Sequence, residues 1–182
     1  MEMKFAVIVH GKGGSPDTSW LPWIKSALEA RGYVCLALTF PNEPNSKLAD
    51  WFTVFDTLKV DYTQTIFIAH ARGAMATLRW IERLPSESKI HQIITVSCNY
   101  DFIPDHQDGD ELYTVPLDYE DLLHKCAKIV VIHSADDPFV PIEAGEQLAR
   151  NLHAKFVRFE DAGHFGADKL EAPEILNQIV DY

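Results

Sequence analysis

Basic residues are scarce in this chain of 182 residues, which has 16 Lys and Arg against 27 Asp and Glu and a formal net charge of -11 at pH 7. Nucleic acids and anionic membrane surfaces are bound through positively charged patches. The composition therefore argues against both nucleic acid and membrane as partners.

Cysteine is also rare, and long hydrophobic runs are absent. Cys35, Cys98 and Cys126 lack the spacing of metal ligands, and three thiols cannot all pair in disulfides. We therefore expect reduced thiols in a cytoplasmic setting, with no bound metal ion or other cofactor. The apolar run Phe5–Val9 near the N-terminus is too short for a signal peptide or a membrane span.

Short apolar runs alternate with amphipathic stretches along residues 1–182, and this length fits a single domain. Such alternation predicts an α/β fold with three layers, in which about six parallel strands have helices on both faces. Strands are expected at Phe5–Val9, Val34–Leu38, Thr65–Ala69, His91–Ser97, Lys128–His133 and Lys155–Phe159. Helices are expected at Ser19–Arg31, Ser46–Leu58 (capped by Asn45 or Ser46), Arg72–Leu84, Leu117–Lys125, Ile142–Leu152 and Ala172–Val180.

The turn after the third expected strand has the pattern of a serine-hydrolase nucleophile turn, with Ala71 where the serine would stand. Such a turn joins a strand directly to a helix and needs small neighbours, here Ala69 and Gly73. A turn of this kind predicts a strained backbone conformation at Ala71. Such strain costs free energy, and it is typically kept at functional sites.

An acid and a histidine follow in the chain order of that hydrolase architecture, which is nucleophile, acid, histidine. Asp137 is the expected acid, although Asp136 and Asp137 together are equally explained as a capping pair for the next helix. His164 follows Gly163 on the loop after the last strand and is the expected general base. Both groups lie just past strand ends, where parallel sheets carry their sites.

A glycine-rich loop, His10–Ser15, follows the first strand. Two backbone N–H groups must converge to stabilise a tetrahedral oxyanion, and we expect them from Arg72 and from Lys12 or Gly11. A phosphate-binding loop is disfavoured because the third glycine of that motif is missing, whereas a simple glycine turn remains an alternative. Residues expected at the substrate pocket are His10, Cys98, Tyr113 and Phe165, with Cys98 equally explained as a small buried hydrophobe.

At this point the chain resembles the small, lidless α/β-hydrolases of the retinoblastoma-binding serine hydrolase and YdeN-like group. The resemblance covers nearly the whole chain and is carried by Val9-His10-Gly11, Gly13-Gly14, Trp20 and Trp23, Ala69–Gly73, Ser134–Pro141 and Asp161–Phe165. It implies a six-stranded sheet in the order 2-1-3-4-5-6, no large lid, and Asp137 and His164 as acid and base of a catalytic triad. It further implies a small ester or amide-like substrate.

The chain departs from this family in two places. The stretch Leu58–Tyr62 lacks the Leu-x-Cys-x-Glu motif of the retinoblastoma-binding member, so that partner is not expected. Ala71 has three explanations, namely a serine-to-alanine change introduced into a hydrolase, natural loss of the nucleophile, and direct activation of water by Asp137 and His164. Under the first two the chain is expected to be inactive, and under natural loss it acts as a binding module for a small molecule or a protein.

Overall fold

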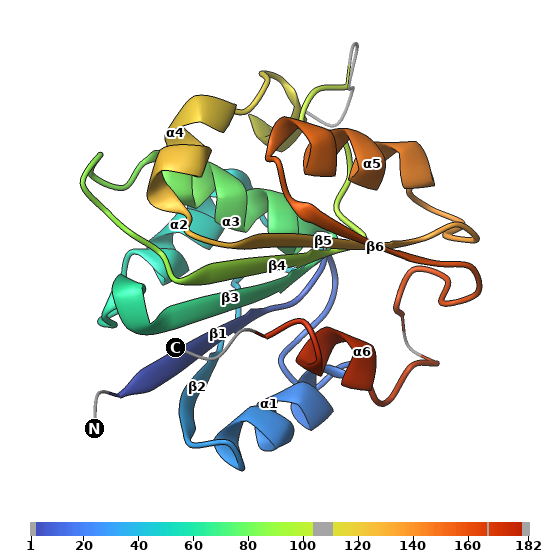
Figure 1. Ribbon diagram of the computed structural model, residues 1–182, viewed down its shortest axis with the longest axis horizontal. Helices are drawn as coiled ribbons and strands as arrows, with labels where there is room; N and C mark the ends of the chain where they lie inside the picture. Colours follow the sequence, from blue (N-terminus) through green and yellow to red (C-terminus); the bar gives the residue numbers. More distant parts are fainter. Residues whose placement is uncertain (1–2, 104–110, 167, 180–182) are drawn as a thin grey trace.

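Six strands form one parallel sheet. The computed structural model describes residues 3–103, 111–166 and 168–179, and its strands pair in the order β2-β1-β3-β4-β5-β6 (Figure 1). The predicted fold class and strand order are confirmed. The strands are β1 (Lys4–Val9), β2 (Tyr33–Ala37), β3 (Thr65–His70), β4 (Gln92–Val96), β5 (Ile129–Ser134) and β6 (Lys155–Phe159). The helices are α1 (Leu21–Glu29), α2 (Leu48–Phe55), α3 (Arg72–Glu82), α4 (Tyr119–Lys125), α5 (Ile142–Asn151) and α6 (Pro173–Leu176), with single 3-10 turns η1 (Tyr62–Gln64) and η2 (Glu111–Tyr113).

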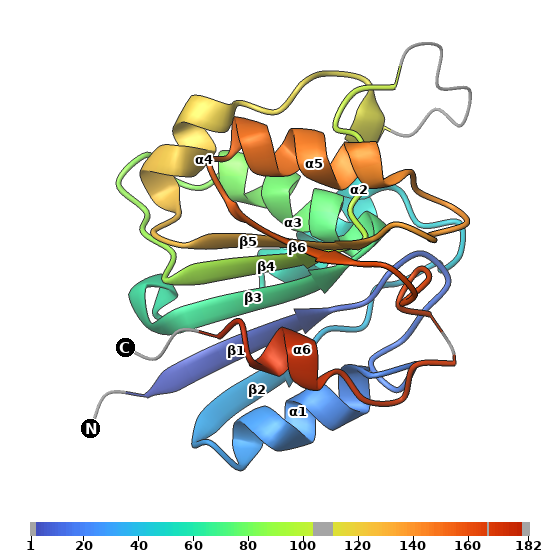
Figure 2. The same cartoon turned by 45° about the vertical axis from the view of Figure 1, so that its right-hand side comes forward.

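Helices cover both faces of the sheet. Helices α1 and α6 lie on one face and α2 to α5 on the other, as both views show (Figures 1 and 2). Successive strand residues point to opposite faces, so Val7 and Val9 pack with Trp51 and Trp80 in one buried cluster, whereas Ile8 packs in the other, with Trp20, Ile24 and Leu28. Burial on both faces explains why the strands are almost continuously apolar.

Helix α1 begins at Leu21, two residues later than predicted. Ser19 has a φ of 57°, a left-handed conformation that cannot continue a helix. Its hydroxyl donates to backbone carbonyls near the other end of the chain, those of Phe165 (3.2 Å) and Lys169 (3.0 Å). A tertiary contact thus replaces the expected first turn.

Helices α2 and α6 are also shorter than predicted. The predicted cap of α2 at Asn45 or Ser46 is wrong, because the backbone N–H of Lys47 donates to the Asp50 carboxylate (2.8 Å) and helical residues begin at Leu48. Helix α6 ends at Leu176. Beyond it the Gln178 carbonyl accepts from the side chain of Gln92 in β4 (2.7 Å), so the chain follows the sheet instead of the helix axis; Val180, the predicted end, lies outside the described residues.

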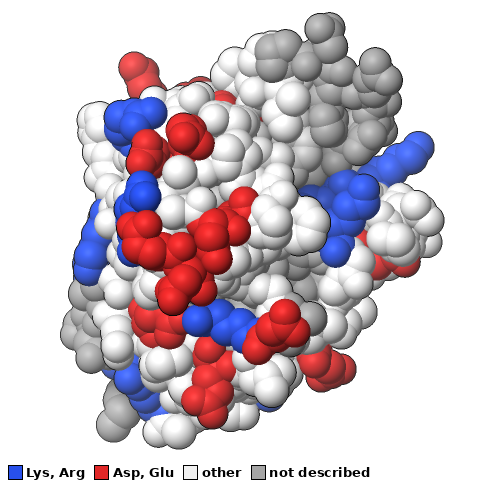
Figure 3. Space-filling view, turned by 90° about the vertical axis from the view of Figure 1, so that its right-hand side faces the viewer, with Lys and Arg blue, Asp and Glu red and all other residues white. Residues whose placement is uncertain are grey.

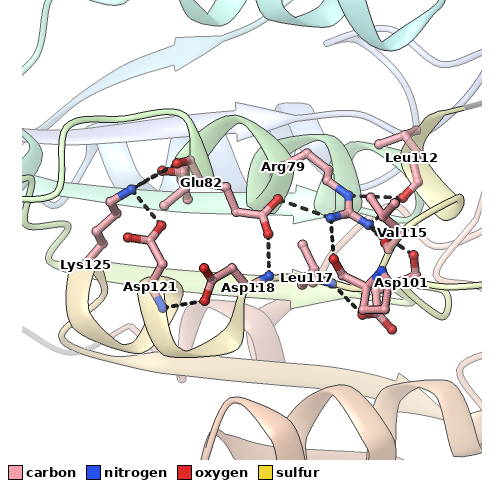
Figure 4. A network of polar contacts seen from close by, with 11 residues as sticks. Arg79, Glu82, Asp101, Leu112, Val115, Leu117, Asp118, Asp121 and Lys125 are labelled. Carbon is pink, nitrogen blue, oxygen red and sulfur yellow. Dashed lines mark hydrogen bonds and ion pairs between the residues drawn. The ribbon is translucent and has the colours of Figure 1, made fainter.

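Two buried cations attach the segment after β4 to helix α3 (Figure 4). Arg79 is only 6% exposed, yet its guanidinium serves as the donor for several backbone carbonyls of this segment. The acceptors are the carbonyl oxygens of Asp101 (3.1 Å), Leu112 (3.1 Å), Val115 and Pro116 (3.2 Å). Lys125 of α4 is 2% exposed and donates to the last carbonyls of α3, those of Ile81 (3.2 Å) and Glu82 (3.1 Å), and to that of Leu84 (2.7 Å) just beyond the helix.

We expect Arg79→Met to lower the free energy of unfolding by about 2–4 kcal/mol, because it leaves several buried carbonyls without a donor. Arg83→Met is the control, since Arg83 is exposed and its ion pair with Asp56 is long (3.6 Å), so its effect stays below about 1 kcal/mol. Urea unfolding of the two variants measures the difference, and equal losses would contradict the assigned role of Arg79.

Candidate functional site

The turn between β3 and α3 has an unusual backbone conformation. Ala71 has φ 49° and ψ -122°, and a non-glycine residue in such a region costs on the order of 1–3 kcal/mol. The predicted strain at Ala71 is confirmed. Alanine gains nothing from this conformation by itself, so the surrounding structure must impose it.

Close contacts with strand β1 and strand β4 hold the turn. The backbone N–H of Ala71 donates to the Val96 carbonyl at 2.8 Å. A Cβ at Gly73 would lie 2.1 Å from the His10 carbonyl oxygen, and one at Gly11 would lie 3.2 Å from the Ala71 methyl. The first distance is impossible for any side chain, so the start of α3 sits against the end of β1 only because residue 73 is glycine.

His164 and Asp137 form a close pair. His164 Nδ1 lies 2.7 Å from Asp137 Oδ2, and since a carboxylate only accepts, Nδ1 carries the proton and Nε2 is left as the basic nitrogen in the neutral ring. The other carboxylate oxygen accepts the backbone N–H groups of Phe139 (2.9 Å) and Val140 (3.0 Å). His133 Nε2 lies 3.4 Å from Oδ2. The carboxylate is therefore held on several sides.

The charge of Asp137 is strongly favoured despite burial. Burial by itself raises the pKa of the carboxyl, but hydrogen bonds from His133, His164 and two backbone N–H groups outweigh it and bring the pKa well below its usual range. The neighbouring Asp136 has a different task, because it accepts from the Ser134 hydroxyl (2.6 Å) and the Gly163 N–H (2.8 Å). Of the two adjacent acids, Asp137 is thus the one in contact with the His164 ring.

Three side chains that the sequence analysis did not assign hold the His164 loop in place. His70 Nε2 donates to the His164 carbonyl (2.8 Å), and Trp20 Nε1 donates to the Phe165 carbonyl (3.0 Å). Ser19 adds the hydroxyl contacts described above. The two tryptophans of the resemblance were visible in the sequence, but which carbonyl Trp20 meets depends on contacts across about 145 residues of chain.

Burial keeps His70 neutral. Desolvation lowers its pKa to about 4, although the hydrogen bond to the His164 carbonyl opposes that shift. The His70 ring, next to the turn between β3 and α3, is therefore uncharged at neutral pH when it donates its hydrogen bond to the His164 carbonyl.

A cavity of about 660 Å³ opens where these elements meet. Six of the predicted site residues line it: Gly11, Lys12, Ala71, Arg72, Tyr113 and His164. Also lining it are Gly13, Gly14, Thr18, Ser19, Leu21, His70, Ser97, Asn99, Phe139, Val140 and Gly166. The molecular face beyond the carboxyl ends of the strands has acidic side chains gathered on one side (Figure 3), but no carboxylate is among these described lining residues.

Three predicted pocket residues are not among the lining residues. His10 is 1% exposed and its Nδ1 bonds the Gly11 carbonyl (2.7 Å). Cys98 is fully buried, and burial raises the pKa of its thiol to about 12, so it is the small hydrophobe of the alternative explanation. Phe165 is also fully buried, with its ring edge-to-face against Phe159. All three side chains are buried in the interior and do not line the cavity.

Among the lining residues that the sequence analysis did not assign to the site, Phe139 and Ser97 have unusual surroundings. Phe139 is 77% exposed and its ring lies 5.2 Å from that of His164. Ser97 is fully buried, has a φ of 51°, and its hydroxyl has no hydrogen-bond partner among the described residues. A serine after a strand is common, so the sequence does not indicate the positive φ of Ser97 or its unpaired hydroxyl.

Within the described part of the chain, no group of three or more His, Cys, Asp or Glu residues could hold a metal ion. A helix of the length and apolarity needed to cross a membrane is likewise missing from those residues.

Comparisons with known proteins find similarity over most of the chain. A family model described as serine hydrolase matches residues 6–172. The chain is 30% identical to serine hydrolase RBBP9 of Rattus norvegicus, over 88% of this chain and 86% of that protein. It is 31% identical to the putative hydrolase YdeN of Bacillus subtilis, over 91% and 88%. The crystal structure of the ydeN product superposes with a TM-score of 0.88, at 29% identity and 96% coverage of both chains. Est1E from Butyrivibrio proteoclasticus shares the fold, with a TM-score of 0.70 at 15% identity, over 97% of this chain and 85% of that one.

We expect Gly73→Ala to lower the free energy of unfolding by about 3 kcal/mol or more, because its Cβ would meet a backbone oxygen that cannot move away. Gly166→Ala is the matched control, since a Cβ there has no atom within 4 Å, and its effect stays within about 1 kcal/mol. Thermal or urea unfolding compares them; a tolerated Gly73→Ala would contradict the close approach of β1 and α3.

We also expect stability to fall as the pH is lowered from 7 to 4, in part because of His70. In the unfolded chain this residue binds a proton near pH 6.5, whereas in the folded chain its pKa is about 4. The unfolded state then binds more protons between these values, so the stabilisation is complete above pH 6.5 and is lost towards pH 4, on the order of 3 kcal/mol. His70→Gln keeps an N–H donor but does not titrate, so its unfolding free energy should depend less steeply on pH; identical slopes in denaturant titrations would refute the assignment.

Proposed function

Because the chain belongs to the serine hydrolase family, we propose that its cavity binds the acyl part of a small ester- or amide-like ligand. We further propose that the chain with alanine at position 71 does not cleave that ligand by covalent catalysis. The observation that carries the proposal is the convergence of the strained turn at Ala71 and the 2.7 Å His164–Asp137 contact at one cavity.

Each group has a role in acyl transfer. His164 Nε2 is the general base, and Asp137 fixes its tautomer and stabilises the imidazolium that forms. The backbone N–H of Arg72, at the start of α3, and that of Lys12 or Gly11 receive the developing oxyanion. Residue 71 is where a hydroxyl would attack the carbonyl carbon, but the alanine methyl group offers no nucleophile.

The ligand class follows from the family and the cavity. Membership of a hydrolase family implies a small-molecule substrate, and 660 Å³ suits a ligand of modest size. Lys12 and Arg72 are among its lining residues, which favours neutral or anionic ligands such as esters, thioesters, amides and the free acids. Three free thiols are compatible with the proposed cytoplasmic setting.

A second candidate function is the binding of a ligand by a protein that is not a hydrolase even when residue 71 carries a hydroxyl. It is favoured by Ala71 itself, because a turn that keeps its strain without a nucleophile still shapes a cavity. Under this reading the chain is a ligand-binding pseudo-hydrolase, and restoring a hydroxyl would not restore catalysis.

The substitution Ala71→Ser separates these functions. We expect it to hydrolyse p-nitrophenyl acetate and butyrate at least about 10³-fold faster than the unaltered chain, because loss of a nucleophile removes most of the covalent rate enhancement. It should also react with a fluorophosphonate probe. Ala71→Gly is a second control, since glycine relieves the strain that alanine and serine share and adds no hydroxyl, and Ala71→Ser/His164→Ala tests the base.

Failure of a folded Ala71→Ser variant to label or hydrolyse would overturn the hydrolase proposal and favour the binding module. Equal hydrolysis by the unaltered chain and by Ala71→Ser, lost in both with His164→Ala, would instead point to direct activation of water.

A further inference from the structure

Ser97 is the lining residue whose chemistry the roles above leave unused. It follows the last residue of β4, is 0% exposed, and its hydroxyl is without a hydrogen-bond partner among the described residues. Its φ of 51° is left-handed, which a serine rarely adopts. A buried hydroxyl without a hydrogen bond and a strained backbone each cost free energy. Ser97 has both, and it lines the cavity.

The sheet register places Ser97 beside residue 71. His70 pairs with Val96 across β3 and β4, so the next residues, Ala71 and Ser97, lie level at the carboxyl ends of neighbouring strands. The Ala71 N–H donates to the Val96 carbonyl at 2.8 Å and the Ser97 N–H donates to the Ile132 carbonyl at 2.9 Å, which continues the ladder through both. Neighbouring strands are about 4.8 Å apart, roughly three carbon–carbon bond lengths, so Ser97 is within reach of the first carbons of an acyl chain whose carbonyl carbon is held at residue 71.

The part of the ligand that Ser97 meets follows by elimination. In acyl transfer the carbonyl oxygen points at the oxyanion N–H groups and the leaving group at the imidazole. The substituent that remains is the acyl chain, whose first carbon lies next to the carbonyl. A hydroxyl can both donate to and accept from a second hydroxyl, whereas a plain alkyl chain offers the Ser97 hydroxyl no hydrogen-bond partner.

We propose that the Ser97 hydroxyl is a specificity-determining group that hydrogen-bonds a hydroxyl on the carbon next to the ligand's carbonyl. The cleft then selects 2-hydroxyacyl ligands over plain alkanoyl ones. This inference rests on the proposed function, because it takes residue 71 as the point at which the carbonyl carbon is held.

Binding to the unaltered chain tests the inference, because alanine at position 71 lets ligands be titrated without covalent turnover. The probes are the anilides of 2-hydroxybutanoic and butanoic acid, titrated by calorimetry. We expect the 2-hydroxy anilide to bind about 5-fold more tightly than the butanoic anilide, as one net hydrogen bond allows.

Ser97→Ala is the decisive variant, because alanine keeps the same backbone strain and removes only the hydroxyl. It should bring the 5-fold preference close to 1 while leaving the affinity for the butanoic anilide within about 2-fold. Thr95→Val is the matched control. Thr95, within β4, also has a buried hydroxyl without a hydrogen-bond partner among the described residues, but it is not among the lining residues, so this variant should keep the preference.

Three outcomes overturn the inference. These are equal affinity of the unaltered chain for the 2-hydroxy and plain anilides, a preference that survives Ser97→Ala, and one that Thr95→Val also abolishes. The phenyl esters of the same acids, assayed with Ala71→Ser, separate this failure from failure of the proposed function. If Ala71→Ser hydrolyses both esters equally well, only the role of Ser97 is wrong; if it is inactive and no anilide binds, the proposed function falls as well.

Discussion

The close approach of β1 to the start of α3 is the constraint on which the rest of the site depends. With glycine at position 73 the helix can start against the His10 carbonyl, and a Cβ there would lie 2.1 Å from that oxygen. This contact and the ladder hydrogen bond to β4 force Ala71 into its strained conformation. The cost is offset by the packing of a sheet buried on both faces, so the turn stays in place although its alanine makes no use of the strain.

The histidine loop is held by the opposite end of the chain. Trp20 and Ser19, which precede α1, donate to carbonyls of the loop, and His70 donates to the His164 carbonyl from the elbow. Since burial keeps His70 neutral, its ring adds no positive charge next to His164. The turn, the acid and the base are thereby fixed by contacts between segments that the sheet alone brings together.

Asp136 and Asp137 show how surroundings give two adjacent carboxylates different roles. Asp136 and Asp137 are adjacent and chemically identical, but only Asp137 accepts from both His164 and the backbone N–H groups of Phe139 and Val140. The sequence favoured Asp137 through its surrounding motif while leaving a capping pair as an alternative. The structure shows that both acids organise the turn, and that one of them also contacts the histidine.

The alternation of apolar runs and amphipathic stretches determined the layered parallel sheet, and the resemblance supplied the strand order, because burial on both faces leaves a strong local pattern in each element. The residues of the elbow, the acid and the histidine also carry local motifs. The start of α1 at Leu21, the exclusion of His10, Cys98 and Phe165 from the cavity, and the unpaired Ser97 hydroxyl were decided by tertiary structure alone. Each depends on which distant group fills the space beside a side chain, and no pattern within one segment of sequence records that.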